Sequence, residues 1–226
     1  MTFYRVSIHR GIMKNALLGY ILFLCSFMAN AIDKVVVGNF SAGDLTGWKS
    51  KKFDGMTDYQ LENIGNTLVL KAVSDTAASG LVKKQHIDLD KTPYLQWRWR
   101  IDNRLGRMNE KAKLGDDYAA RVYVIVSGGW TFWKTRAINY VWSANQQKQA
   151  AWSNAFVGKN AIMIALRGRQ DATGVWYQQK RNVKADLKQQ FGEDIRYIDA
   201  LAIMTDTDNA KGHAVAYYGD IFFSAD

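Results

Sequence analysis

The chain has 226 residues, with 30 Lys and Arg against 21 Asp and Glu, a net charge of +9, eight Trp and a single Cys. This length suits one domain with a sizeable core, the lone Cys excludes a disulfide framework, and three His argue against a His-rich metal centre. The basic residues are spread along the chain instead of being gathered in an arm, which argues against nucleic acid and favours partners such as acidic polysaccharide.

The first 31 residues have the plan of a secretory signal peptide. A basic stretch (1–15) precedes an apolar run (16–28), and Ala29-Asn30-Ala31 is a small-x-small cleavage site. We expect cleavage after Ala31, with Met13 as an alternative start and an uncleaved N-terminal anchor as the competing interpretation. Cleavage would remove three basic residues, no acidic ones and the only Cys, so the net charge would fall from +9 to +6. No transmembrane segment would remain, and the predicted location is the periplasm or the cell exterior.

Alternation of apolar and polar residues predicts strands through most of the remaining chain. In the segment 94–102, Trp97 and Trp99 share an apolar face, where we expect core packing. One helix is expected at 183–191, because Val183 and Leu187 recur at helical spacing and Gly192 is placed as a C-terminal stop. The expected strands are 34–40, 58–64, 66–73, 79–89, 94–102, 118–130, 135–144, 160–168, 174–183, 197–205 and 214–223.

These elements predict an all-β fold. About ten strands joined by short polar turns, with one short helix, indicate an antiparallel β-sandwich of jelly-roll type. No linker or repeat interrupts residues 32–226, so a single domain is expected there. A Rossmann arrangement is excluded because alternating helices and a G-x-G-x-x-G loop are both missing from the sequence.

Aromatic side chains and arginines supply the candidate ligand-binding residues. Flat aromatic faces stack on sugar rings, and guanidinium groups bind carboxylate or sulfate bidentately. The alternatives are that the aromatics fill the core and that the arginines form a solvated face paired with Asp and Glu. The candidates are Arg98, Arg100, Arg121, Trp130, Trp133, Tyr140 and Trp142.

Two pairs of aspartates are candidates for a metal site or for acid/base catalysis. Asp116 and Asp117 end a long charged connection, and with Arg121 they suit a buried ion network, a Ca²⁺ site or acid/base catalysis. Asp206 and Asp208 follow an apolar strand. Their spacing fails the EF-hand pattern, because the fifth position is Ala210 and the twelfth is aromatic, so an ordinary turn is the alternative.

Several segments together resemble the bacterial family catalogued as domain of unknown function 3047. The resemblance runs from about residue 40 to residue 223 and implies an exported Gram-negative protein with one β-rich domain and no established activity. The segments are YLQWRWRID, KLGDDYAARVYV, INYVW, NAFVGKNAIMIALRG, RNVKADLKQQFGED, IDALAIMTDTDN and AYYGDIFF.

The two ends of the domain are similar to galactose-binding-like carbohydrate-binding jelly rolls. The segments GNFSAGDLTGW (38–48) and YYGDIFF (217–223) correspond to the first and last strands of those folds. This similarity implies that the two strands pair and that a structural Ca²⁺ lies near Asp44 and Asp220.

Three functions follow as hypotheses. The first is a non-catalytic glycan-binding module that favours acidic ligands, and we therefore lean against an enzyme. The second is a glycoside hydrolase or lyase that uses Asp116, Asp117, Asp206 or Asp208 as acid/base groups. The third is a structural envelope protein that binds another protein. The sequence does not determine the ligand or the oligomeric state.

Overall fold

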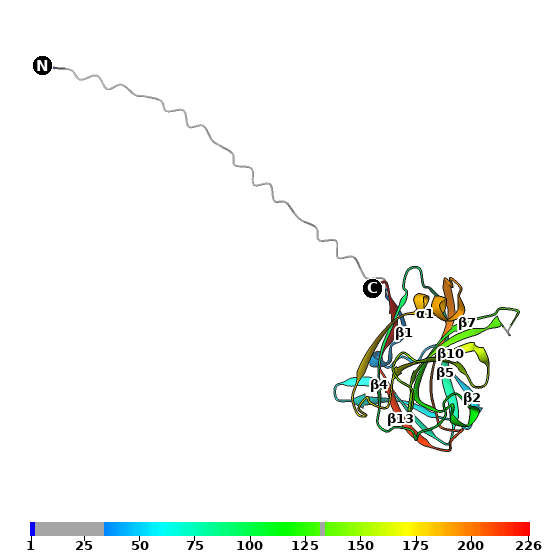
Figure 1. Cartoon of the computed structure of the whole chain (residues 1–226). Coiled ribbons are helices and arrows are strands. Elements are labelled where there is room, and N and C mark those ends of the chain that lie inside the picture. The colour runs from blue at the N-terminus through cyan, green and yellow to red at the C-terminus, as the bar shows by residue number, and fades with distance from the viewer. Residues whose placement is uncertain (3–33, 132–133) are drawn as a thin grey trace. The chain divides into compact units, whose positions relative to one another are not determined.

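The computed structural model describes residues 1–2, 34–131 and 134–226 (Figure 1). The predicted signal peptide lies outside the described residues apart from Met1 and Thr2, and so does Trp133. The chain divides into two units, of which the second, Ile32–Asp226, holds all the described residues except Met1 and Thr2. In the part of the chain that the structure describes, no helix has the length and apolar character needed to cross a membrane.

The second unit is a β-sandwich of two sheets, which confirms the predicted fold class. The strands of the first sheet are β1 (Lys34–Gly38), β3 (Asp58–Ile64), β4 (Thr67–Asp75), β6 (Tyr94–Ile101), β11 (Tyr177–Asn182), β13 (His213–Tyr218) and β14 (Ile221–Ser224). They follow the order β1-β14-β6-β13-β4-β3, and β11 pairs with β6. The chain's first and last described strands pair antiparallel, with Val35 opposite Phe223.

The second sheet carries the site described below. Its strands are β2 (Trp48–Asp54), β5 (Ala78–Asp88), β7 (Tyr118–Val126), β8 (Arg136–Trp142), β9 (Ala151–Asn154), β10 (Gly158–Arg167) and β12 (Tyr197–Asp206). They follow the order β2-β5-β12-β7-β8-β10-β9. One pair departs from the expected antiparallel pattern, because β8 and β10 run parallel, with Ile138 opposite Ile162. Short 3-10 turns lie at Phe40–Ala42 and Lys113–Gly115.

The core lies between the two sheets and is rich in aromatic residues. Trp97 and Trp99 of β6 are fully buried, as their alternation with polar residues predicts, and their rings meet edge to face with centroids 5.3 Å apart. Tyr140 of β8 packs on Trp97 from the second sheet. The two sheets are therefore held together by large rings from both sides.

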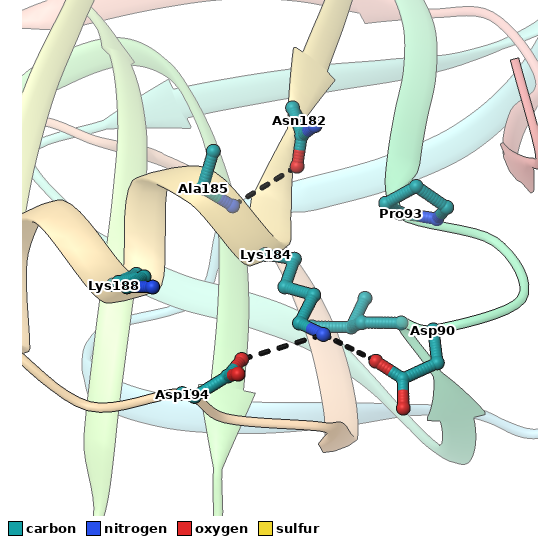
Figure 2. A pocket seen from close by; sticks show the side chains of 8 residues that line it. Asp90, Pro93, Asn182, Lys184, Ala185, Lys188 and Asp194 are labelled. Atoms are coloured by element: carbon teal, nitrogen blue, oxygen red, sulfur yellow. Dashed lines mark hydrogen bonds and ion pairs between the residues drawn. The ribbon is translucent and has the colours of Figure 1, made fainter.

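The helix α1 (Val183–Phe191) occupies the predicted residues. Its N-terminus is capped by Asn182, whose side chain accepts a hydrogen bond from the Ala185 N–H at 2.9 Å, and Gly192 ends it at a φ of 74°. Figure 2 shows this cap beside a hollow of about 390 Å³. Three of the charged groups there pair with one another, because Lys184 bridges Asp90 and Asp194.

Two strands have no counterpart in the sequence prediction, and both are edge strands of the second sheet. In addition, the segment 214–223, predicted as one strand, forms the two strands β13 and β14. The strand β2 (WKSKKFD) is rich in Lys and mostly exposed, so its side chains do not alternate in polarity. The strand β9 has four residues. Charge and shortness both protect a sheet edge from pairing with other chains, and both remove the periodicity that reveals a strand.

Candidate ligand-binding groove

A groove of about 550 Å³ lies on the outer face of the second sheet, on the side away from the core. Each of the seven strands or its adjoining turn contributes to its lining. The lining residues are Phe53, Asp54, Ala78, Asp116, Arg121, Tyr123, Ala137, Asn139, Asn154, Phe156, Val157, Ala161, Met204, Asp206, Asp208 and Asn209. We call this surface the groove.

Strand alternation places these side chains on the outer face. On β7, Val122 and Val124 belong to the core, so Arg121 and Tyr123 point the other way into the groove. Small side chains lie on β5 and β10, where Ala78 and Ala161 line the groove on either side of the larger Arg121 and Tyr123 of β7. The groove therefore combines large side chains on the central strands and at the rim with small ones on the strands between them.

The rim of the groove is apolar and exposed. Phe53 comes from the edge strand β2 and is 64% exposed, while Phe156 comes from the turn between β9 and β10 and is 53% exposed. Val157 beside it is also exposed. Large apolar side chains left in water beside a cavity are typical of binding surfaces. Neither phenylalanine was predicted from the sequence, because Phe53 lies on an edge strand without alternation and Phe156 lies in a turn after the short strand β9.

Arg121 is the buried centre of the polar end of the groove. It is 3% exposed, and its Nε donates to Asp206 Oδ1 at 2.7 Å, while Nη2 bonds the other Asp206 oxygen and the main-chain oxygen of Asp116. Its Nη1 lies 3.5 Å from Asp116 Oδ2 and donates to the Tyr123 hydroxyl at 3.1 Å. The two predicted aspartate pairs thus meet at Arg121. The ion network expected between Arg121 and the first pair forms through Asp116, and Asp206 takes part in it in place of Asp117.

Asp117 holds the turn that follows β12. Its carboxylate accepts hydrogen bonds from the Asn209 N–H at 3.0 Å and from the Ala210 N–H at 2.7 Å. Carboxylate oxygens of Asp117, Asp206 and Asp208 all lie within 4.8 Å of one another. Arg121 and the turn's N–H groups already engage the first two carboxylates, so this arrangement is explained by its own hydrogen bonds.

Burial dominates the electrostatics of this end of the groove. It raises the pKa of the Asp206 carboxyl, and the Arg121 guanidinium opposes that change. Burial also raises the pKa of Asp208, with the charge of Asp117 as the second cause. Asp208 is only partly buried, so it is the carboxyl group of the cluster that combines a raised pKa with access from the groove.

Asn139 supplies an unused polar group in the groove. It is 1% exposed, and its side-chain oxygen has no hydrogen-bond partner among the described residues. It lies on β8 directly opposite Tyr123 of β7. Buried amide oxygens are normally bonded, so this one is available to a hydroxyl group that enters the groove.

The other predicted arginines lie elsewhere. Arg98 and Arg100 belong to β6 in the first sheet, whereas Arg121 belongs to the second. Arg98 stacks on Trp176 at 4.7 Å, and Arg100 forms an ion pair with Asp102 at 2.6 Å. The three candidate arginines therefore do not line one surface, because β6 and β7 belong to different sheets, and ligand binding by Arg98 and Arg100 stays a prediction.

Most of the predicted aromatic ligand residues also lie outside the groove. Tyr140 and Trp142 are 0% and 3% exposed, because both lie on the core-facing phase of β8, and the Tyr140 hydroxyl donates to Asp186 at 2.7 Å. This burial corrects the prediction that they bind ligand. Trp130 is fully exposed but does not line the groove, and Trp133 lies outside the described residues.

The two aspartates predicted to hold Ca²⁺ have local partners. Asp220 accepts hydrogen bonds from the Ser41 N–H at 2.8 Å and from its hydroxyl at 2.5 Å, and Asp44 accepts from the Thr46 N–H at 2.7 Å. Neither belongs to a cluster of three acidic, His or Cys ligands within the described residues. The calcium site at these positions stays a prediction.

The fold and the groove define a β-sandwich protein that presents a concave sheet face, with a charged end and an aromatic rim. The chain belongs to the family described as "Protein of unknown function (DUF3047)", whose model matches residues 46–222. A search among curated proteins finds no match.

Solved structures with a similar arrangement of strands include carbohydrate-binding modules. The family 30 module of a cellulosomal cellulase of Clostridium thermocellum is 9% identical, covers 86% of this chain and 98% of its own, and gives a TM-score of 0.49. The family 11 module from the same organism, in complex with a mixed-linked tetrasaccharide, is 10% identical over 85% of this chain and 96% of its own, with a TM-score of 0.44. At these TM-scores the similarity assigns no ligand to this chain.

Proposed function

We propose that this chain is an exported, non-catalytic glycan-binding protein of the periplasm, and that the groove is its binding site. The observation that carries the proposal is the pair of exposed phenylalanines, Phe53 and Phe156, at the rim of a groove with a polar end. Aromatic rings stack on the apolar faces of sugars, while amides and carboxylates accept their hydroxyl groups. The volume of about 550 Å³ lies within the range of about 300–1,000 Å³ typical of ligand sites.

The polar groups of the groove suit hydroxyl-bearing ligands. Asn139 offers its unpartnered oxygen, and Asn154 donates to Asp116 at 3.1 Å beside the rim. Asp208 offers a partly accessible carboxyl. These groups are mostly hydrogen-bond acceptors, which sugar hydroxyls can satisfy.

The charge of the lining favours neutral glycans. Four carboxyl groups line the groove, from Asp54, Asp116, Asp206 and Asp208, against the single guanidinium of Arg121. An acidic sugar would meet net negative charge here. The preference for acidic ligands, predicted from the overall basic charge, therefore stays a prediction that the groove itself does not support.

Alanine substitution at the rim tests the proposal. A Phe side chain presents roughly 200 Å², and Phe156 exposes 53% of its surface, so one face covered by sugar is of order 50 Å². At about 25 cal/mol per Å² this contributes about 1.3 kcal/mol, or about tenfold in affinity. A glycan array with neutral and acidic polysaccharides should first identify a ligand, and calorimetry should then show about tenfold weaker binding for Phe156→Ala and for Phe53→Ala.

Two matched variants make the result specific. Trp130→Ala removes a fully exposed aromatic side chain outside the groove and should leave the affinity unchanged, and Phe156→Trp should retain binding. If the folded protein binds no glycan, or if only Trp130→Ala weakens binding, the groove is not a glycan site. The first of these outcomes would favour a structural protein that binds another protein, and the second would place the glycan site at Trp130.

The convergence of carboxyl groups favours a glycoside hydrolase as a second candidate. Asp208 has the raised pKa of a general acid and faces the groove. However, Asp206 is 1% exposed and bonded through both oxygens to Arg121, so it is poorly placed to contact a sugar. Incubation of the protein with the bound glycan, followed by a reducing-end assay, distinguishes the two. Release that is lost in Asp208→Asn would establish catalysis.

A further inference from the structure

A second cavity lies among the connections at the ends of β6, β8 and β10. Its volume is about 770 Å³, and it shares no lining residue with the groove. The connection between β6 and β7 contributes Arg107, the one between β8 and β9 contributes 145–148, and the one between β10 and β11 contributes 168–171. The lining residues are Arg107, Asn145, Gln146, Gln147, Lys148, Gly168, Arg169, Gln170 and Asp171. We call it the basic pocket.

The charges of the basic pocket are not balanced. Its only acidic residue, Asp171, is 6% exposed and already forms ion pairs with Lys148 at 2.7 Å and with Arg167 at 3.1 Å. Arg107 and Arg169 are both exposed and have no ion pair or hydrogen-bonded side-chain partner within the described residues. Two guanidinium groups therefore remain available in a cavity whose one carboxylate is neutralised.

The walls of the basic pocket are tied to the core by buried hydrogen bonds. Asp171 accepts from the Gly168 N–H at 2.8 Å, which closes the turn after β10. Glu110, which is fully buried, accepts from the Ser143 hydroxyl at 2.5 Å and from the Ala144 N–H at 2.6 Å. These bonds join the connection after β6 to the connection after β8. The cationic side chains thus project from backbone that is held in place before a ligand arrives.

Apart from Lys148 and Gly168, the remaining lining residues carry side-chain amides, and none has a large apolar side chain. The groups that could recognise a ligand here by charge and hydrogen bonds are therefore the guanidinium groups and these amides. Guanidinium groups bind carboxylate and phosphate oxygens bidentately, and glutamine and asparagine amides donate to the same oxygens. We propose that the basic pocket is a binding site for a small oxyanion, a carboxylate or phosphate group carried by a ligand, separate from the groove.

The inference does not depend on the function proposed for the groove. The chain has a basic net charge, and the basic pocket is a place where that charge could bind an anion, since the charged groups of the groove are mainly acidic. Neutral and anionic ligands would then bind at two places on the same domain.

Titration calorimetry on the full-length chain at low salt tests the proposal with three sugars of similar size. Glucuronate carries a carboxylate, glucose 6-phosphate carries a phosphate, and glucose is the neutral control. We expect binding of at least one anionic sugar and none of glucose, with affinity falling as salt is added. The double variant Arg107→Gln/Arg169→Gln should weaken that binding by at least about tenfold, because two charge-assisted contacts are lost.

Two controls separate the pocket from general charge effects and from the groove. Lys84→Gln/Lys91→Gln removes two exposed charges elsewhere and should leave the anion affinity unchanged, as should Phe156→Ala. Thermal melting should show that all variants fold. The proposal is overturned if neither anion binds, if glucose binds equally well, or if the lysine control loses as much affinity as the arginine variant. Loss of glycan binding in Phe156→Ala with anion binding intact would show that the two sites are independent.

Discussion

Replacing Arg121 with Met should destabilise the domain because it leaves a carboxylate buried without its partner. The guanidinium gives Asp206 two hydrogen bonds, and Asp206 is only 1% exposed. Hydrogen bonds to charged groups contribute about 1.5–3 kcal/mol each, and breaking a buried ion pair costs about 3–5 kcal/mol. We expect Arg121→Met to lower the free energy of unfolding by about 3–5 kcal/mol at pH 7, a large share of the roughly 5–15 kcal/mol typical of a domain.

The loss of stability caused by Arg121→Met should become smaller as the pH is lowered. Burial already raises the pKa of Asp206, and without Arg121 to oppose it the pKa rises further in the folded state. A group with a raised folded pKa contributes its full stability below its unfolded pKa, about 3.9 for Asp, and loses it as pH rises through the folded value. The deficit of Arg121→Met should therefore be smaller at pH 4.5 than at pH 7.

Urea unfolding followed by Trp fluorescence measures both effects, with circular dichroism to confirm the fold. The double variant Arg121→Met/Asp206→Asn removes the orphaned charge and should be more stable at pH 7 than Arg121→Met alone. Our reasoning would be refuted by a cost below about 1 kcal/mol, by a deficit that does not change with pH, or by a double variant less stable than the single one.

Two further predictions concern parts of the fold away from the groove. Asn182→Ala removes the cap of α1, so the free energy of unfolding should fall by about 1 kcal/mol, and Asn182→Asp should keep most of the stability; equal loss in both would contradict the capping role. Burial raises the pKa of Glu110, so its contribution is fully present below the unfolded pKa of about 4.3 and is lost as pH rises through the folded value. The stability of the wild type relative to Glu110→Gln should consequently decline between pH 4 and pH 8 in urea titrations, and an increase would show that the sign is wrong.

The aspartates illustrate what spacing can and cannot reveal. Asp116 and Asp117 precede one strand, and Asp206 ends another, so the sequence indicated two acidic turns at strand ends. That the turns meet at Arg121 depends on the pairing of β7 with β12, where Asp206 lies opposite Tyr118. Which distant strands pair depends on the packing of the whole core, so the pairing cannot be predicted from local alternation of apolar and polar residues.

The aromatic residues of the groove rim could not be predicted from the alternation of apolar and polar residues. Phe53 lies in a Lys-rich edge strand and Phe156 in a turn, and neither has apolar neighbours at alternating positions. By contrast, Tyr140 and Trp142 stood out in the sequence because they alternate with polar or smaller residues. That same alternation with Ile138 is what directs them into the core.

The sequence by itself determined the β-sandwich class, the burial of Trp97 and Trp99 and the bounds of α1, because these depend on local alternation, capping and helix stops. Only the tertiary structure decided which residues share a site. Arg98 and Arg121 occupy similar positions on two similar strands, yet they belong to different sheets. Alternation specifies the two faces of a strand, whereas long-range pairing decides which sheet the strand joins and which residues meet across it.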